Sequence, residues 1–70
     1  MNKKEYYKKT YPKGTRIKII NLCNNEENYP AGLTGTVVYV DDALQIHVNW
    51  DNGGGIALLP EEGDIFAIVK

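Results

Sequence analysis

The strict alternation of apolar and polar residues from Leu44 to Trp50 constrains the fold more than any other feature of the chain. The apolar positions are Leu44, Ile46, Val48 and Trp50, and the polar positions are Gln45, His47 and Asn49. A period of two is typical of a strand with one face in the core and the other in water. Asn52-Gly53 follows closely and predicts a hairpin with a type I′ turn, because both residues tolerate positive φ angles. An antiparallel β-sheet is therefore expected.

Four further segments show the short apolar runs of strands, separated by turn residues. They cover residues 15–22, 35–40, 56–59 and 65–69, with a long polar loop at 24–31 and a tight connection at 60–64. Five short strands with one long loop favour a small barrel, since closure removes exposed sheet edges. An OB-fold fits less well, because it usually carries a helix where this chain has only a hairpin. The expected fold class is all-β, a five-stranded SH3-like barrel over residues 13–70.

Residues 1–12 form a basic, tyrosine-rich N-terminal arm. Asn2 followed by Glu5 predicts a short capped helix that ends before Tyr11-Pro12, because the residue preceding a proline avoids helical angles. A helix this short is marginal in isolation, so the arm is helical only if its tyrosines pack on the barrel. Residues 1–18 carry seven cations and one anion, whereas residues 19–70 carry one lysine and eight carboxylates. The near-neutral average therefore hides a strong charge separation.

Cysteine content and hydropathy indicate the compartment. The single cysteine, Cys23, excludes an intramolecular disulfide and a cysteine-based zinc site within one chain. No apolar run reaches the roughly 18 residues of a membrane span, and residues 1–7 lack the apolar region of a signal peptide. A cytoplasmic protein without membrane association is expected.

No residue pattern in the chain predicts catalysis or metal binding. His47, the only histidine, falls on the wet face of its strand, and nothing places it beside Cys23, which we interpret as a small apolar filler. The acidic doublets Glu26-Glu27, Asp41-Asp42 and Glu61-Glu62 lie in turns and loops, where neighbouring carboxylates diverge. We therefore expect a protein that is not an enzyme and has no metal or cofactor site.

Several segments of the chain are similar to one known family. They are Tyr11-Pro12-Lys13-Gly14-Thr15-Arg16-Ile17, Pro30-x-Gly32-x-x-Gly35-Thr36-Val37, Val40-Asp41-Asp42, Gln45-Ile46-His47-Val48-x-Trp50-Asp51-Asn52-Gly53 and Leu58-x-Pro60. Together they resemble domain-of-unknown-function family 4314, short proteins of Gram-positive bacteria, phages and mobile elements, over residues 11–69. The resemblance implies an SH3-like barrel without an assigned activity, and it leaves the arm before Tyr11 outside. The two glycines of the second segment also resemble the start of a strand in KOW-type barrels.

Two sets of residues are candidates for binding a partner. Tyr29, Tyr39 and Trp50 are candidates for an aromatic surface that binds a protein or peptide beside the long loop. Tyr39 faces outward if a bulge turns both Val37 and Val40 inward, whereas Trp50 also fits a core position. The basic set, suited to the phosphates of a nucleic acid, is Lys3, Lys4, Lys8, Lys9, Lys13 and Arg16.

The expected function is a small, monomeric, non-enzymatic module of phage or mobile-element type that binds a protein or peptide. The alternative is a nucleic-acid-binding accessory protein that uses the basic arm and a KOW-like barrel together. The acidic charge of residues 19–70 argues against this alternative, because it repels phosphates unless the arm alone makes the contact.

Overall fold

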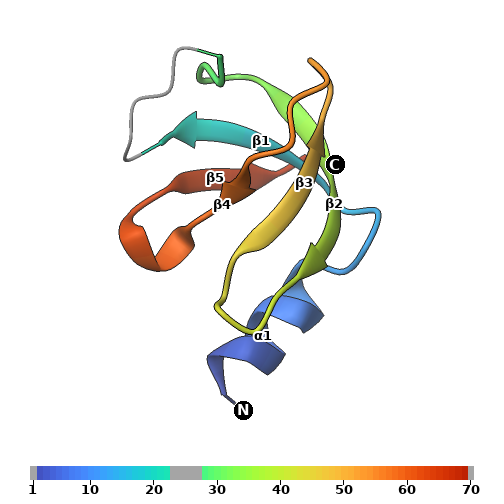
Figure 1. Cartoon of the computed structure of the whole chain (residues 1–70), viewed down its shortest axis with the longest axis vertical. Helices are drawn as coiled ribbons and strands as arrows, with labels where there is room; N and C mark the ends of the chain where they lie inside the picture. The colour runs from blue at the N-terminus through green and yellow to red at the C-terminus, as the bar shows by residue number, and fades with distance from the viewer. Residues whose placement is uncertain (1, 23–27, 70) are drawn as a thin grey trace.

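The computed structural model describes residues 2–22 and 28–69 and contains one antiparallel sheet with a short N-terminal helix (Figure 1). The elements are the helix α1 (Lys3–Thr10), the strands β1 (Arg16–Asn21), β2 (Thr34–Val40), β3 (Ile46–Trp50), β4 (Ala57–Leu58) and β5 (Ile65–Ile68), and the 3₁₀ turn η1 (Pro60–Glu62). The five strands expected from the sequence are all present. The expected tight connection at 60–64 contains η1.

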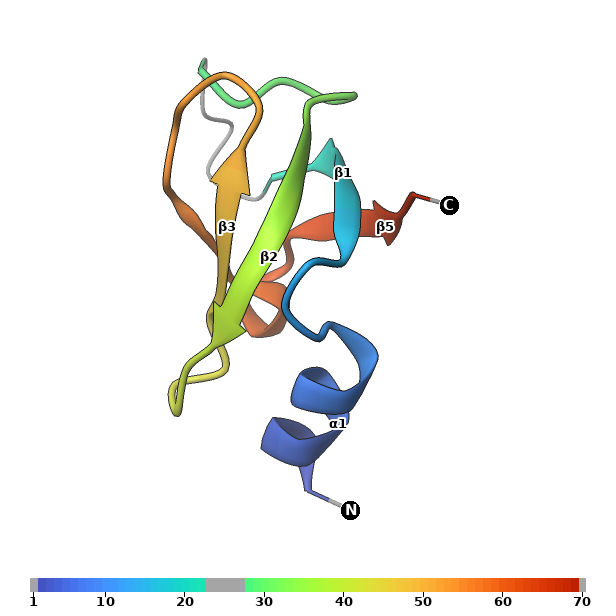
Figure 2. The same cartoon turned by 90° about the vertical axis from the view of Figure 1, so that its right-hand side faces the viewer.

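The strands follow the order β4-β3-β2-β1-β5, and every neighbouring pair is antiparallel. Seen from the side, β5 runs at a steep angle to β2 and β3, so the sheet is strongly curled (Figure 2). No ladder among the described residues joins β4 to β5, and these two strands form the edges. The prediction of a five-stranded, all-β fold is confirmed, and between these edges the curled sheet is open.

Alternating strand residues build the core. Its buried members are Ile17, Ile19, Leu22, Val37, Val40, Ile46, Val48, Trp50 and Leu58. In β1 the pattern is simple, because Ile17 and Ile19 point inward while Arg16 and Lys18 are exposed. Burial of this apolar surface is the main stabilising contribution available to so small a domain.

A bulge in β2 changes which side chains face the core. The register with β3 shifts between Val37 and Tyr39, and as a result Val37 and Val40 are both buried while Val38 and Tyr39 are exposed. Strict alternation would have put Val37 and Val40 on opposite faces of the sheet. The bulge expected from the apolar pattern is therefore present, and it turns Tyr39 toward solvent.

The hairpin after β3 differs from the type I′ prediction. Gly53 has a φ angle of 87°, but Asn52 does not have a positive φ, whereas a type I′ turn needs positive φ at both positions. The Gly53 amide donates to the Trp50 carbonyl at 2.9 Å, and the Trp50 amide donates to the Gly54 carbonyl at 3.1 Å. This is the pattern of a three-residue loop that ends in a glycine bulge. The place of the turn was predicted correctly, and its type was wrong because the loop holds one more residue.

Helix α1 begins at the cap expected from the sequence. The Asn2 side chain accepts a hydrogen bond from the Glu5 amide at 2.8 Å, which satisfies one of the amides left free at a helix start. The helix ends at Thr10, before the Tyr11-Pro12 pair. Figures 1 and 2 both place α1 beneath one end of the sheet, next to the end of β2.

Candidate functional site

Helix α1 is held against the rest of the fold by two carboxylates that come later in the chain, Asp42 and Glu61. Glu61 of η1 accepts from the Lys3 ammonium at 2.6 Å and from the Tyr7 hydroxyl at 2.8 Å, while Lys4 pairs with Asp42 at 2.6 Å. The hydrogen bond to Glu61, with burial, raises the pKa of Tyr7 to about 12. Lys3, and then Tyr7, lowers the pKa of Glu61. The arm is therefore a docked helix, and two of its lysines are paired with carboxylates of the sheet region.

An aromatic path continues this contact into the core. The rings of Tyr7 and Tyr11 lie 6.3 Å apart between centroids, and Tyr11 packs on Phe66 of β5 at 5.3 Å. Burial raises the pKa of the Tyr11 phenol. These contacts position the segment after α1, and with it Pro12 and Lys13, beside β2.

A groove of about 440 Å³ lies between the end of α1 and the outer part of β2. One wall consists of Lys8, Tyr11, Pro12 and Lys13, and the other consists of Val38, Tyr39 and Val40. The bulge creates this second wall, because it exposes both Val38 and Tyr39. The groove thus combines apolar and aromatic surface with two lysines, and no carboxylate of the described residues lines it.

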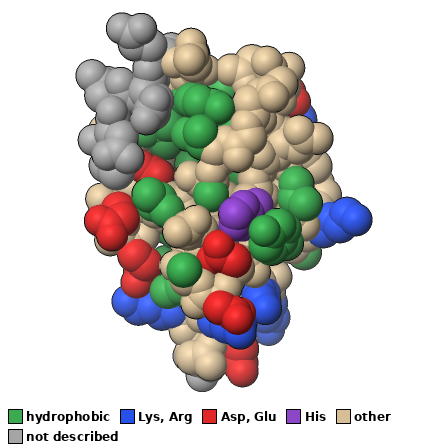
Figure 3. Space-filling model, viewed as in Figure 1, with side chains coloured by type: hydrophobic (Ala, Val, Ile, Leu, Met, Phe, Trp, Pro, Cys, Tyr) green, Lys and Arg blue, Asp and Glu red, His purple; other side chains and the backbone are tan. Residues whose placement is uncertain are grey.

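Tyr39 is held at the rim of this groove by a stacked histidine. The rings of Tyr39 and His47 are 4.3 Å apart with an interplanar angle of 7°. His47 Nε2 lies 2.8 Å from Asp41 Oδ2, and Asp41 Oδ1 accepts from the amides of Ala43 and Gln45 at 2.9 Å each. The bond to His47 first, and then the Gln45 amide, lowers the pKa of Asp41. Figure 3 shows the imidazole at the surface between hydrophobic and acidic side chains.

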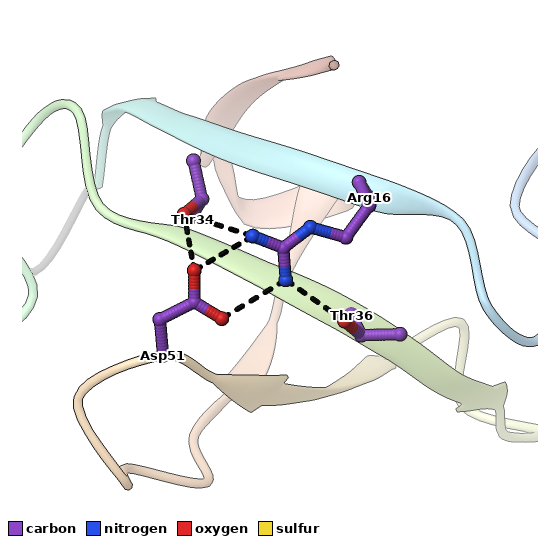
Figure 4. A network of polar contacts seen from close by, with 4 residues as sticks. All are labelled: Arg16, Thr34, Thr36 and Asp51. Carbon is purple, nitrogen blue, oxygen red and sulfur yellow. Dashed lines mark hydrogen bonds and ion pairs between the residues drawn. The ribbon is translucent and has the colours of Figure 1, made fainter. Parts of the chain in front are cut away.

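A second polar cluster joins β1, β2 and the turn after β3 on the outer face of the sheet (Figure 4). Arg16 of β1 makes a two-pronged ion pair with Asp51, with Nη1–Oδ1 at 2.9 Å and Nη2–Oδ2 at 2.7 Å. The same guanidinium donates to Thr36 at 2.9 Å and to Thr34 at 3.2 Å, and Thr34 also donates to Asp51. The bond to Arg16, followed by that to Thr34, holds the pKa of Asp51 well below its usual range. Asp51 raises the pKa of Arg16 in turn.

Trp50 belongs to the core and offers almost no surface to a partner. Its side chain is 2% exposed, and its indole N–H donates to the Ile56 carbonyl at 3.0 Å. Tyr29 packs edge-on against it at 6.2 Å. In the ladder Trp50 lies opposite Gly35, whereas Tyr39 lies opposite His47 toward the other end of β2. The expected surface of three aromatic residues is therefore not assembled: Trp50 is removed from it, and Tyr29 and Tyr39 are separated along the sheet.

The six basic candidates divide into two groups. Lys3, Lys4 and Arg16 are paired with Glu61, Asp42 and Asp51. Lys8, Lys9 and Lys13 have no ion pair within the described residues. Of these, Lys8 and Lys13 line the groove. Both lysines and Tyr39 were predicted from the sequence, whereas Val38 and the Asp41–His47 contact were not. Asp41 and His47 lie on the two sides of a short hairpin. Their separation of six residues in the sequence could have indicated the contact.

Other kinds of site are not found in the part of the chain that the structure describes. No three of its His, Cys, Asp or Glu side chains gather where they would hold a metal ion. Cys23 and the doublet Glu26-Glu27 lie outside the described residues. Among residues 2–22 and 28–69 there is no helix of the length and apolar character that crossing a membrane requires.

Comparison with known proteins gives one match. The searches of curated proteins and of solved structures found no match. The sequence model of a family described as a domain of unknown function (DUF4314) matches residues 2–69. The resemblance expected from the sequence began only at Tyr11, so this match corrects that boundary and includes α1 in the shared domain. Since the match covers nearly the whole chain, the protein belongs to the DUF4314 family.

Proposed function

We propose that this protein is a small, non-enzymatic binding module that holds a short acidic segment of a protein partner in the groove between α1 and β2. One observation carries the proposal: the groove has apolar and aromatic walls, and the charged side chains that line it in the described part of the chain are Lys8 and Lys13. An apolar side chain of the partner would lie against Tyr39 and Pro12. Carboxylates on either side of it would pair with the two lysines.

The side chains that line the groove support a peptide as its ligand. Exposed aromatic and aliphatic surface in a concave site favours burial of apolar side chains, and lysines at the rim favour partners of opposite charge. Tyr39 is 53% exposed but is held by the stacked His47, so little side-chain entropy is lost when it binds. A groove of about 440 Å³ suits one or two side chains of a partner.

The proposal also includes a fold type and a biological setting. We propose that the curled sheet is an SH3-like barrel of KOW type and that the protein acts in the cytoplasm, in a phage or a mobile element. The barrel type is supported by the resemblance in the segment from Gly32 to Val37, the phage or mobile element by the resemblance to the family, and the cytoplasm by the single cysteine. Neither the barrel type nor the setting is needed for the groove to bind a peptide.

A displayed library of random peptides, selected on the folded protein, tests the proposal. The expected peptides carry Asp or Glu on both sides of an aromatic or aliphatic residue. The variant Lys8→Glu/Lys13→Glu should fail to select them. The matched control is Lys9→Glu/Lys18→Glu, which makes the same change in charge at exposed lysines outside the groove. Selected peptides without acidic residues, or identical selections on both double variants, would contradict the proposal.

A second candidate function is binding of single-stranded nucleic acid at the same groove. The exposed ring of Tyr39 beside Lys8 and Lys13 favours it, since a base can stack on the ring while phosphates meet the lysines. Pairing of Lys3, Lys4 and Arg16 within the protein argues against a longer contact. A titration with single-stranded oligonucleotides distinguishes the two. This candidate requires affinity that falls with salt, with a log–log slope of about −0.7 per phosphate contacted, and that falls again in Tyr39→Ala.

A further inference from the structure

The edge strand β5 lacks the usual protection of a sheet edge. Natural edges carry charges, prolines, bulges or very short strands that prevent further pairing. The opposite edge, β4, has only two residues and is followed closely by Pro60. In contrast, β5 consists of Ile65, Phe66, Ala67 and Ile68, without a charged or proline residue. The register shift in its ladder with β1, between Ile19 and Asn21, lies near Ile65 and leaves Phe66, Ala67 and Ile68 in regular pairing. The β4 edge is therefore protected against pairing with a further strand, whereas the β5 edge is not.

Apolar side chains remain exposed along β5. Ile65 is 51% exposed, Ile68 is 44% exposed, and Val69 just after the strand is 38% exposed. Ile68 lies opposite Ile17, which is fully buried, and so points to the core side of the sheet. It is still half-exposed because no described strand lies beyond it. The core is thus unfinished at this edge, and one more strand would complete it.

The backbone of β5 is also open on this side. The Val69 amide donates to the Arg16 carbonyl of β1 at 2.8 Å. Backbone groups alternate along a strand, so those of Ala67 face β1 and those of Phe66 and Ile68 face outward. No backbone group of another described residue bonds to the outward side of these two residues. Two residues therefore present free donors and acceptors at the edge.

We propose that β5 pairs with β5 of a second copy of this chain, antiparallel, about a two-fold axis that is perpendicular to the sheet and passes beside Ala67. In this register Phe66 of each copy lies opposite Ile68 of the other, and each such pair exchanges two hydrogen bonds. Ile65 lies opposite Val69, and the two Ala67 residues meet at the axis. The register uses every outward backbone group of Phe66 and Ile68, and each cross-strand pair of large side chains is apolar.

The chemistry of the edge favours a second copy over a foreign strand. The strand is uncharged, so pairing it with itself brings no like charges together, and the chain as a whole has a net charge of only −1. A two-fold contact also closes on itself and consumes both open β5 edges. The proposed dimer differs from the monomer expected from the sequence. It does not rest on the peptide-binding proposal, because the groove is lined by residues of α1, of the segment 11–13 and of β2, and by none of β5.

Sedimentation equilibrium over about a hundredfold range of protein concentration tests the dimer. The short interface predicts a concentration-dependent mass that rises from the 7.9 kDa of one chain to twice that value. Ile68→Pro removes an outward amide, a change that an edge strand tolerates in the monomer. It should weaken association at least about tenfold. Ile65→Lys tests the same contact through its side chain if the proline variant does not fold.

The control variant is Tyr6→Lys, which removes an equally exposed apolar residue, 53% exposed, from α1. It should dimerise as the wild type does. In hydrogen exchange, the amides of Phe66 and Ile68 should become protected as the concentration rises. A chain that stays at the mass of one copy over the whole range overturns the proposal. Assemblies larger than a dimer would also contradict it. So would equal effects of Tyr6→Lys and Ile65→Lys on dimerisation.

Discussion

Gly35 of β2 lies directly opposite Trp50 of β3, and it leaves no room for a side chain. A Cβ atom at Gly35 would come within 2.7 Å of the indole Cε3 and within 2.7 Å of a Val48 methyl group. The second glycine of the Gly32-x-x-Gly35 segment is therefore required by the indole that packs against it. Gly32, in contrast, has a φ angle of 95° and open space around it.

Gly35→Ala should destabilise the protein by about 1–3 kcal/mol, because the added methyl group overpacks the core against Trp50. Urea unfolding followed by tryptophan fluorescence measures the change. Gly55→Ala is the matched control, since a Cβ there meets nothing within 4 Å, and it should change stability by less than about 0.5 kcal/mol. Equal effects of the two variants would show that the Gly35–Trp50 contact is wrong.

Trp50→Ala should impair the stability of the protein, whereas Tyr39→Ala should impair its binding of peptides. Loss of the buried indole should cost about 3–5 kcal/mol, comparable to the whole stability of a domain of this size. Loss of the exposed Tyr39 ring should cost less than about 1 kcal/mol and leave a folded protein that no longer selects peptides. Circular dichroism and thermal melting measure both changes. A stable Trp50→Ala protein would contradict the core position of this side chain.

Asp51 should make the stability of the protein depend on acid. Its pKa is depressed in the folded state, so its contribution is complete above the unfolded value near 4 and is lost as the pH falls through the folded value. The difference in unfolding free energy between wild type and Asp51→Asn should shrink steadily below about pH 5. In an Arg16→Met background this pH dependence should largely disappear, since Arg16 is the main cause of the shift. If the pH dependence remained in the Arg16→Met background, Arg16 would not be the main cause of the lowered pKa of Asp51.

Glu61→Gln should return one tyrosine to ordinary titration behaviour. The pKa of Tyr7, raised to about 12 chiefly by its bond to Glu61, should move down toward 10. The stability linked to Tyr7 is complete below about pH 10 and is lost as the pH rises toward 12. Ultraviolet titration of the phenols measures the shift. Glu62→Gln removes the neighbouring charge without touching Tyr7, and a matching shift there would mean that the Tyr7–Glu61 bond is absent.

Local patterns predicted most of the fold, and long-range contacts account for what they missed. The alternation from Leu44 to Trp50 indicates β3 because sheet side chains repeat every two residues, although the strand begins only at Ile46. Leu44 instead adopts a φ angle of 62° in the hairpin that Asp41 organises. The helix cap at Asn2 depends on residues three apart and was also predictable.

The candidate site was less predictable, because its parts meet only after folding. Tyr39 and Lys8 lie on different elements, and the groove between them depends on the bulge and on the docking of α1. The burial of Trp50 does follow the alternation along β3, whereas its contact with Tyr29, far away in the sequence, forms only on folding. Arg16 was predicted as a nucleic-acid contact from its charge alone, but its guanidinium is paired with Asp51 in the turn after β3.

The two bonds from Glu61 to Lys3 and Tyr7 also bear on how the protein is made. They span 58 and 54 residues, and Phe66, which receives Tyr11, comes later still. A ribosome adds residues one at a time from the N-terminus, so the segment that becomes α1 leaves it long before η1 and β5 exist. A helix of eight residues is marginal on its own. The segment that becomes α1 is therefore synthesised well before the residues that hold it, and the groove that it helps to form is completed only after η1 and β5 have left the ribosome.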